Sequence, residues 1–133
     1  MNKRNNELPG VMVLAFLGDA RHTLFVRQML ISRGIAKSKE LNAEAQRYVT
    51  AEAQAAMFKK IEEQLTEEEL SVFRRAHNST HLNKPKRASG SDYRIATGFE
   101  AVIGMLEFIG DRERLDYLLK KSHEEDIKND TKN

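Results

Sequence analysis

Apolar residues recur through most of the chain at the three- and four-residue spacing of amphipathic helices. Pro9-Gly10 opens the first predicted helix, over about residues 11–32, and Gly34 suits its C-terminal cap. The apolar side chains surround much of this helix, which predicts a central, buried position. They are Leu14, Leu17, Leu24, Phe25 and Ile31.

The middle of the chain continues as helices separated by polar breaks. A second helical region covers about residues 38–64, with a break near Val49-Thr50, where Thr50 can begin a new helix. Thr66 followed by Glu67, Glu68 and Glu69 predicts a capping box and a helix to about residue 76. Residues 77–91 are rich in Asn, Pro and Gly, which predicts a loop.

Two helices complete the predicted fold. One covers about residues 92–109 and ends at Gly110, and Asp111 then caps a last helix to about residue 123. Residues 124–133 are almost entirely polar, which predicts a frayed tail. We therefore expect an all-α helical bundle with one domain, residues 1–123, followed by a tail over residues 124–133.

Composition narrows the class of protein. The chain has 133 residues and no cysteine, which excludes a disulfide scaffold, a cysteine-ligated metal and a thiol nucleophile. The longest apolar run, Val11–Leu17, is far shorter than the roughly 20 residues that cross a membrane. The amino terminus also lacks the pattern of a signal peptide. We expect a cytoplasmic protein with no membrane association.

Two acidic residues interrupt the apolar faces of their helices. Asp19 lies in the first helix and Glu100 in the penultimate one, and an ionised carboxylate on an apolar face is costly without a partner. Glycines accompany both acids (Gly18, Gly98 and Gly104), which favours close approach of the two helices. Two interpretations remain open: both carboxylates hold one divalent ion, or each pairs with an Arg or Lys.

The residues around the two acids form recognisable blocks. Leu14–Ala20 has the sequence LAFLGDA, and Thr97–Gly104 has the sequence TGFEAVIG, about 80 residues later. These blocks resemble the two signatures of the ribonuclease III catalytic domain, roughly LEFLGDA and DxFEALIGA. The short chain leaves no room for the RNA-binding domain that usually follows, so the resemblance is to the Mini-III branch. Further matches are Val26-Arg27, Arg74-Arg75, Asn78, Pro85-Lys86 and Tyr93-Arg94.

The resemblance implies an activity and a set of site residues. Asp19 and Glu100 would be the catalytic residues and the ligands of Mg²⁺, with Mn²⁺ as a substitute, in hydrolysis of double-stranded RNA that leaves a 5′-phosphate. Thr97 would orient a water molecule. His22, one turn after Asp19, would contact the metal ligands and not the ion itself. A solvent-facing or structural role is nevertheless the stronger interpretation. The family implies a homodimer with two sites, and Mini-III implies the 23S ribosomal RNA precursor as substrate.

The chain also departs from the larger enzymes of the family. They have two further carboxylates, at the positions of Ala15 and Thr97 here, so the number of ions per site and the rate remain open. A second match, Leu106–Asp111 (LEFIGD), has a structural explanation, because Gly110 ends one helix and Asp111 caps the next.

Positive charge is concentrated between Arg74 and Arg94. This segment has six basic residues and one acid, so it carries +5 although the whole chain carries only +2. Such a cluster is typical of phosphate binding, and the scarcity of aromatic residues favours recognition of duplex RNA by shape. The alternative is a solvated loop. The predicted RNA-binding residues are Arg74, Arg75, His77, Asn78, Lys84, Lys86, Arg87 and Arg94.

Two other classes of function remain open from the sequence. A catalytically weak or inactive domain that binds double-stranded RNA would also retain the basic segment. A helical protein-interaction module with accidental matches to both blocks would show neither metal dependence nor affinity for duplex RNA.

Overall fold

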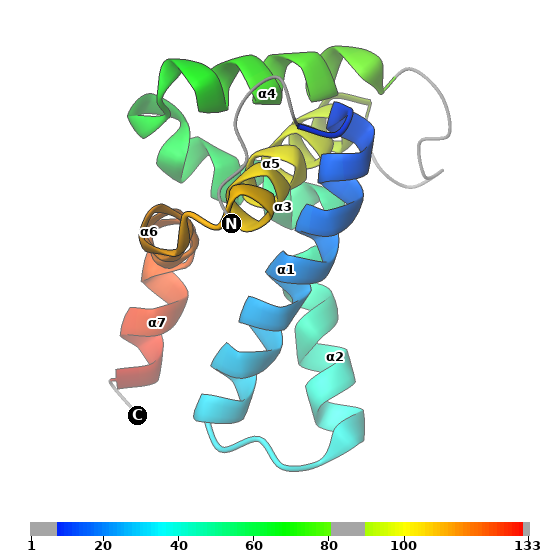
Figure 1. The fold of residues 1–133 in the computed structure, drawn as a ribbon. Helices are drawn as coiled ribbons and strands as arrows, with labels where there is room; N and C mark the ends of the chain where they lie inside the picture. Colours follow the sequence, from blue (N-terminus) through cyan, green and yellow to red (C-terminus); the bar gives the residue numbers. More distant parts are fainter. Residues whose placement is uncertain (1–7, 81–89, 132–133) are drawn as a thin grey trace.

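A computed structural model of the chain describes residues 8–80 and 90–131, and every regular element in these ranges is helical. This confirms the predicted all-α class. The elements, labelled in Figure 1, are α1 (Val11–Ser32), α2 (Ser38–Val49), α3 (Ala51–Ile61), the 3₁₀ turn η2 (Glu62–Gln64), α4 (Glu67–Ser79), α5 (Gly90–Ile109), α6 (Arg112–Ser122) and α7 (Glu124–Thr131).

The predicted helix boundaries are set by the expected capping residues. The Thr50 hydroxyl accepts a hydrogen bond from the amide of Ala53 and separates α2 from α3. Thr66 and Glu69 form the reciprocal capping box at the start of α4. Gly34 and Gly110 adopt positive φ angles of 86° and 80° after α1 and α5, a conformation that glycine adopts without steric cost.

The boundaries differ from the prediction in two regions. Helix α4 continues to Ser79 and α5 begins at Gly90, so both ends of the predicted loop over residues 77–91 are helical instead. Residues 81–89 of that predicted loop lie outside the described ranges. Residues 124–131, expected to be a frayed tail, form the helix α7. Ile127 packs on the core, and the side chain of Asp126 contacts the ring of His123, which explains why this stretch is ordered into a helix.

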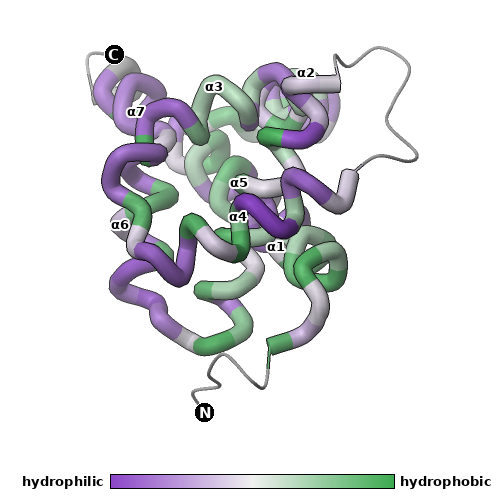
Figure 2. Tube along the Cα trace, turned by 90° about the horizontal axis from the view of Figure 1, so that it is seen from above, coloured by the Kyte–Doolittle hydropathy of each residue, from purple (hydrophilic) through white to green (hydrophobic). Residues whose placement is uncertain are grey.

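Helix α5, rather than α1, occupies the centre of the bundle. It contacts α1, α3, α4 and α6, and Figure 1 shows α1 crossing it with α4 lying across the top. Figure 2 shows apolar stretches gathered around α3 and α5 and hydrophilic stretches on the outside along α6 and α7. Only one face of α1 is buried, so the prediction of a fully central first helix is wrong: Leu24 and Ile31 are exposed.

Helices α1 and α5 cross at two glycines. A Cβ atom on Gly18 would lie 1.7 Å from the carbonyl oxygen of Glu100, and one on Gly104 would lie 1.8 Å from that of Leu14. Any side chain at either position is incompatible with this contact. Gly98 instead faces α4, where a Cβ would lie 2.3 Å from the ring of Phe73. The predicted close approach is therefore confirmed, with Gly98 at a different interface.

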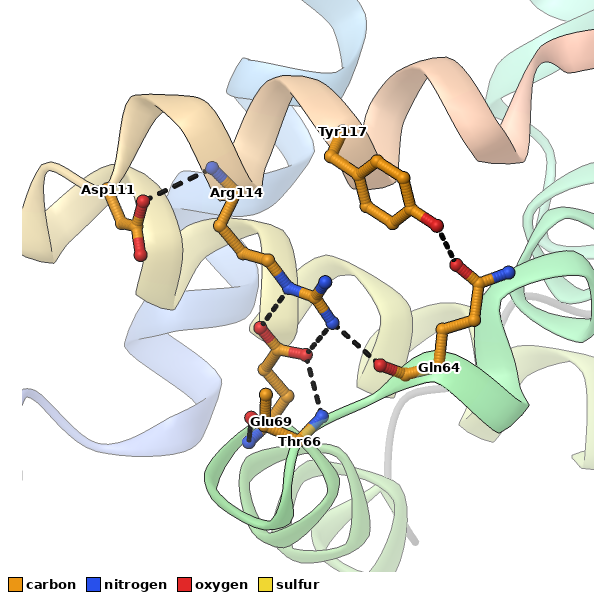
Figure 3. A network of polar contacts seen from close by, with 6 residues as sticks. All are labelled: Gln64, Thr66, Glu69, Asp111, Arg114 and Tyr117. Carbon is orange, nitrogen blue, oxygen red and sulfur yellow. Dashed lines mark hydrogen bonds and ion pairs between the residues drawn. The ribbon is translucent and has the colours of Figure 1, made fainter.

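A second contact between helices is a polar network that joins α6 to the start of α4 (Figure 3). The guanidinium of Arg114 donates to both carboxylate oxygens of buried Glu69, at 2.9 and 2.8 Å, and to the carbonyl of Gln64 at 2.7 Å. Because Glu69 also accepts from the Thr66 amide, one carboxylate both caps α4 and binds α6. Tyr117 adds a hydrogen bond from its hydroxyl to the Gln64 side chain.

Candidate active site

The crossing of α1 and α5 brings the two predicted acids together. Asp19 follows Gly18 on α1, and Glu100 supplies the α5 carbonyl against which Gly18 packs. Burial raises the pKa of Glu100 to about 8, with further contributions from its hydrogen bond to Asp19 and the negative charge of that residue. A proton or a cation between the two carboxylates relieves their repulsion.

The donor set fits a divalent cation that keeps most of its water. Within residues 8–80 and 90–131, no group of three or more His, Cys, Asp or Glu side chains is arranged to hold a metal. Mg²⁺ is bound in proteins by one or two carboxylates, together with water and substrate phosphate oxygens. The Asp19–Glu100 pair meets that requirement, and the charge repulsion within the pair favours a cation there.

Gln54 is a third polar side chain at this site that the sequence did not reveal. It lies on α3, is 2% exposed, and its Nε2 donates to Oε2 of Glu100 at 3.3 Å. This hydrogen bond acts against the other influences and lowers the pKa of Glu100. The available signal was a glutamine on the apolar face of an alanine-rich helix, which becomes informative only once α3 is known to pack on α5.

His22 is fully buried, which excludes the solvent-facing alternative and leaves the structural role, or a place next to the metal ligands. Its Nδ1 lies 3.2 Å from Gln54 Nε2, and its Nε2 lies 2.9 Å from Nε2 of His123. Burial lowers the pKa of His22 to about 3, with a further contribution from His123. His22 is therefore neutral at physiological pH, and it reaches Glu100 only through Gln54.

Thr97 is buried on α5, one turn before Glu100. Its hydroxyl donates to the carbonyl of Tyr93 at 2.9 Å, so the hydroxyl hydrogen is used within the helix. The remaining lone pairs can accept a hydrogen bond. An orienting role for a water molecule stays a prediction.

The structure describes some of the predicted RNA-binding residues and leaves others outside its described ranges. Arg74 and Arg75 are exposed on α4 and Arg94 is exposed on α5. His77 and Asn78, near the end of α4, are hydrogen-bonded to each other at 3.1 Å. Lys84, Lys86 and Arg87 lie outside the described residues. Helices α4 and α5 pack together, so the described cations belong to neighbouring elements.

A groove of about 590 Å³ begins at Asp19 and runs between α1 and α2. Thr23 and Arg27 follow Asp19 at four-residue intervals on α1, and Asn42 and Gln46 line the α2 side. Hydrogen-bond donors and one cation thus lie next to the exposed carboxylate of Asp19. These polar groups suit a phosphate-containing ligand.

The second match to the first block has structural roles, as predicted. Glu107 accepts a hydrogen bond from Nε of Arg21 at 3.0 Å. Asp111 accepts one from the amide of Arg114 at 3.1 Å and caps α6. Glu107 therefore links α5 to α1 through its ion pair, and Asp111 begins α6 as its cap.

Comparison with known proteins identifies the class to which this fold and site belong. A family model described as "Ribonuclease III domain" matches residues 12–111, which include both carboxylates and the whole crossing of α1 and α5. The chain belongs to the ribonuclease III family. This family comprises divalent-metal-dependent nucleases that act on double-stranded RNA.

Individual relatives place the chain in the Mini-III branch. It is 42% identical to the Mini-ribonuclease 3 of Symbiobacterium thermophilum over 82% of this chain and 84% of the relative, and 41% identical to that of Brevibacillus brevis over 90% and 89%. A crystal structure of a Fusobacterium nucleatum protein superimposes with a TM-score of 0.78 at 28% identity, covering 89% of this chain and 94% of the other. None of the described helices is long and apolar enough to span a membrane.

The raised pKa of Glu100 predicts that, in the absence of divalent ions, stability falls as pH rises from about 4.5 to about 8 and levels off above that. Its pKa is about 8 in the folded protein, against 4.5 for an unperturbed glutamate, so the folded protein binds the proton more tightly than the unfolded chain does. The free energy of unfolding therefore falls as pH rises towards 8. Urea unfolding in EDTA between pH 5.5 and 8.5 should show this fall above pH 6.5, and Glu100→Gln should lack it.

His22 provides the control for that measurement. Its pKa is lowered, so protonation of the unfolded chain below about pH 6.5 destabilises the fold in wild type and Glu100→Gln alike. An equal fall above pH 6.5 in both proteins would contradict the assignment of that fall to Glu100.

Proposed function

We propose that this protein is an Mg²⁺-dependent endoribonuclease that hydrolyses double-stranded RNA, with Mn²⁺ as a substitute ion. The observation that carries the proposal is the meeting of Asp19 and Glu100 at the crossing of α1 and α5. Two carboxylates that repel each other favour a bound cation, and the neighbouring groove offers donors to a phosphate.

Each side chain of the site has a defined task in this mechanism. Asp19 and Glu100 hold the ion, and the exposure of Asp19 lets a scissile phosphate approach it. When bound, the ion supplies charge neutralisation at the phosphate and activation of water as the nucleophile. Thr97 orients a water molecule, and Arg27 contacts a neighbouring phosphate from the groove.

The cations of α4 and α5 support a duplex as the substrate. Arg74, Arg75 and Arg94 are exposed, and Lys84, Lys86 and Arg87 fall between them in the sequence, together with His77 and Asn78. Phosphate contacts of this kind fix a duplex without reading its sequence. The similarity to Mini-ribonuclease 3 favours the 23S ribosomal RNA precursor as the cellular substrate.

The exposed apolar stripe of α1 supports a homodimer. Phe16 is 82% exposed, Val13 58% and Met12 44%, and Phe16 lies one turn before Asp19. Contact of this stripe with the same stripe of a second copy about a two-fold axis would bury these side chains. Such a contact would also set two active sites side by side along one duplex.

Neutral isosteres of the two acids should abolish cleavage while leaving the fold intact. Asp19→Asn and Glu100→Gln remove the charges that hold the ion. When no ion is bound, each substitution also removes the repulsion between the two carboxylates, so the fold is kept. The measurement is cleavage of a long duplex RNA with and without Mg²⁺, with circular dichroism to check folding. Asp111→Asn is the matched control and should cut normally.

Cleavage at near wild-type rate by either acid variant would contradict the site assignment. Duplex binding by a wild-type protein that never cuts would instead identify an inactive RNA-binding domain.

Replacing Lys84, Lys86 and Arg87 together by alanine should weaken duplex binding and flatten its salt dependence. Each lost phosphate contact lowers the salt slope by a little under one unit, by analogy with DNA. The measurement is affinity at several salt concentrations. A control that removes the same charge from exposed lysines of α3 and α6, with Lys59, Lys60 and Lys120 changed to alanine, should keep the slope. An unchanged slope in the first variant would mean that RNA docks elsewhere.

The homodimer should depend on the apolar stripe of α1. Phe16→Glu places two like charges at the proposed two-fold contact and should convert the protein to a monomer by light scattering at micromolar concentration. Leu24→Glu, farther along α1, tests how far the contact extends. A fully active wild-type monomer would contradict the proposal.

A further inference from the structure

A chain of buried polar side chains runs from the catalytic carboxylate to the last helix. Gln54 contacts Glu100 at one end and His22 at the other, His22 contacts His123, and Nδ1 of His123 lies 3.0 Å from Oδ2 of Asp126. The three middle members are at most 2% exposed. The chain joins α5, α3 and α1 to the start of α7, elements far apart in the sequence.

With Glu100 ionised, as an ion ligand must be, and both rings neutral, one arrangement of hydrogens satisfies every link. Ionised Glu100 accepts, so Gln54 must present its NH₂ group, whose second hydrogen points to Nδ1 of His22. His22 then carries its hydrogen on Nε2 and donates to Nε2 of His123. His123 in turn carries its hydrogen on Nδ1 and donates to Asp126. Both rings are neutral, and each link fixes the orientation of the next.

In this arrangement Gln54 holds one carboxylate oxygen of Glu100 in place through its hydrogen bond. A buried amide with one hydrogen on Glu100 and the other on His22 cannot rotate without losing both bonds. His22 is itself held by its hydrogen bond to His123 and by edge-on contact with Phe99, with ring centroids 5.3 Å apart. Carboxylates that ligate metals are commonly oriented by such hydrogen bonds from behind.

We propose that Gln54 is a positioning residue for metal binding, and that the chain His22–His123–Asp126 holds it in place. The inference rests on the proposed function, because it assigns Glu100 to an ion. It predicts that the orientation of the Glu100 carboxylate depends on side chains that touch neither ion nor RNA, including one on helix α7.

The test compares two substitutions on α3. Gln54→Met keeps the volume of the side chain and removes both donors, whereas Met57→Ala opens a buried cavity on the same helix at a residue that makes none of the chain's hydrogen bonds. We measure Mn²⁺ binding by calorimetry, and kcat and KM for duplex cleavage over a range of Mg²⁺ concentrations. Gln54→Met should lose roughly 10- to 100-fold in ion affinity, with KM for RNA at saturating Mg²⁺ unchanged.

The control separates positioning from general destabilisation. Met57→Ala should be the less stable protein and yet bind Mn²⁺ like wild type. Asp126→Ala, at the far end of the chain, should weaken Mn²⁺ binding by less than Gln54→Met does. Wild-type affinity and Mg²⁺ dependence in Gln54→Met would overturn the inference, and so would equal losses in both α3 variants.

A measurement on the wild-type protein keeps the inference testable if a variant fails to fold. Nitrogen-15 NMR of the histidine rings at neutral pH should show His22 with its hydrogen on Nε2 and His123 with its hydrogen on Nδ1. The opposite tautomer at His22 would break the link to Gln54 and overturn the inference. Failure of the proposed function is distinguishable, because wild type itself would then neither bind Mn²⁺ nor cut RNA.

Discussion

The crossing of α1 and α5 at Gly18 and Gly104 is the constraint on which the rest of the molecule depends. Each glycine faces a backbone carbonyl of the other helix at a distance that no Cβ atom can occupy. Because the two contacts are reciprocal and one turn apart on each helix, they fix both the position and the register of the crossing. The surrounding helices then pack around the other sides of α5.

The same contact forms the candidate active site, and it does so at an energetic cost. Asp19 and Glu100 are 81 positions apart in the sequence, and the crossing brings them close enough for Asp19 to raise the pKa of Glu100. Elsewhere a buried acid meets an opposite charge, as Glu69 meets Arg114. At the crossing two acids face each other without a described cation, so the repulsion is available as binding free energy for a metal ion.

Sequence patterns predicted the elements and the two acids, since both depend on local signals. Caps such as Thr50, Thr66 and Asp111 act within one turn, and the two blocks around the acids are short. The position of α5 at the centre, the exposed face of α1 and the helix α7 depend on packing between distant segments. The contacts of Gln54 and His22 became visible only when α3 and α1 were placed against α5.

The opposing influences on the pKa of Glu100 show why a buried donor would matter to a proposed metal ligand. Ion binding requires the ionised carboxylate, so the proton competes with the metal. With a pKa of about 8, releasing that proton at pH 7 costs on the order of 1 kcal/mol, which a divalent ion readily offsets. Burial and Asp19 raise the pKa, and Gln54 alone among the described contacts lowers it. The amide on α3 therefore favours the ionised carboxylate, which is the form that the proposed ion would bind.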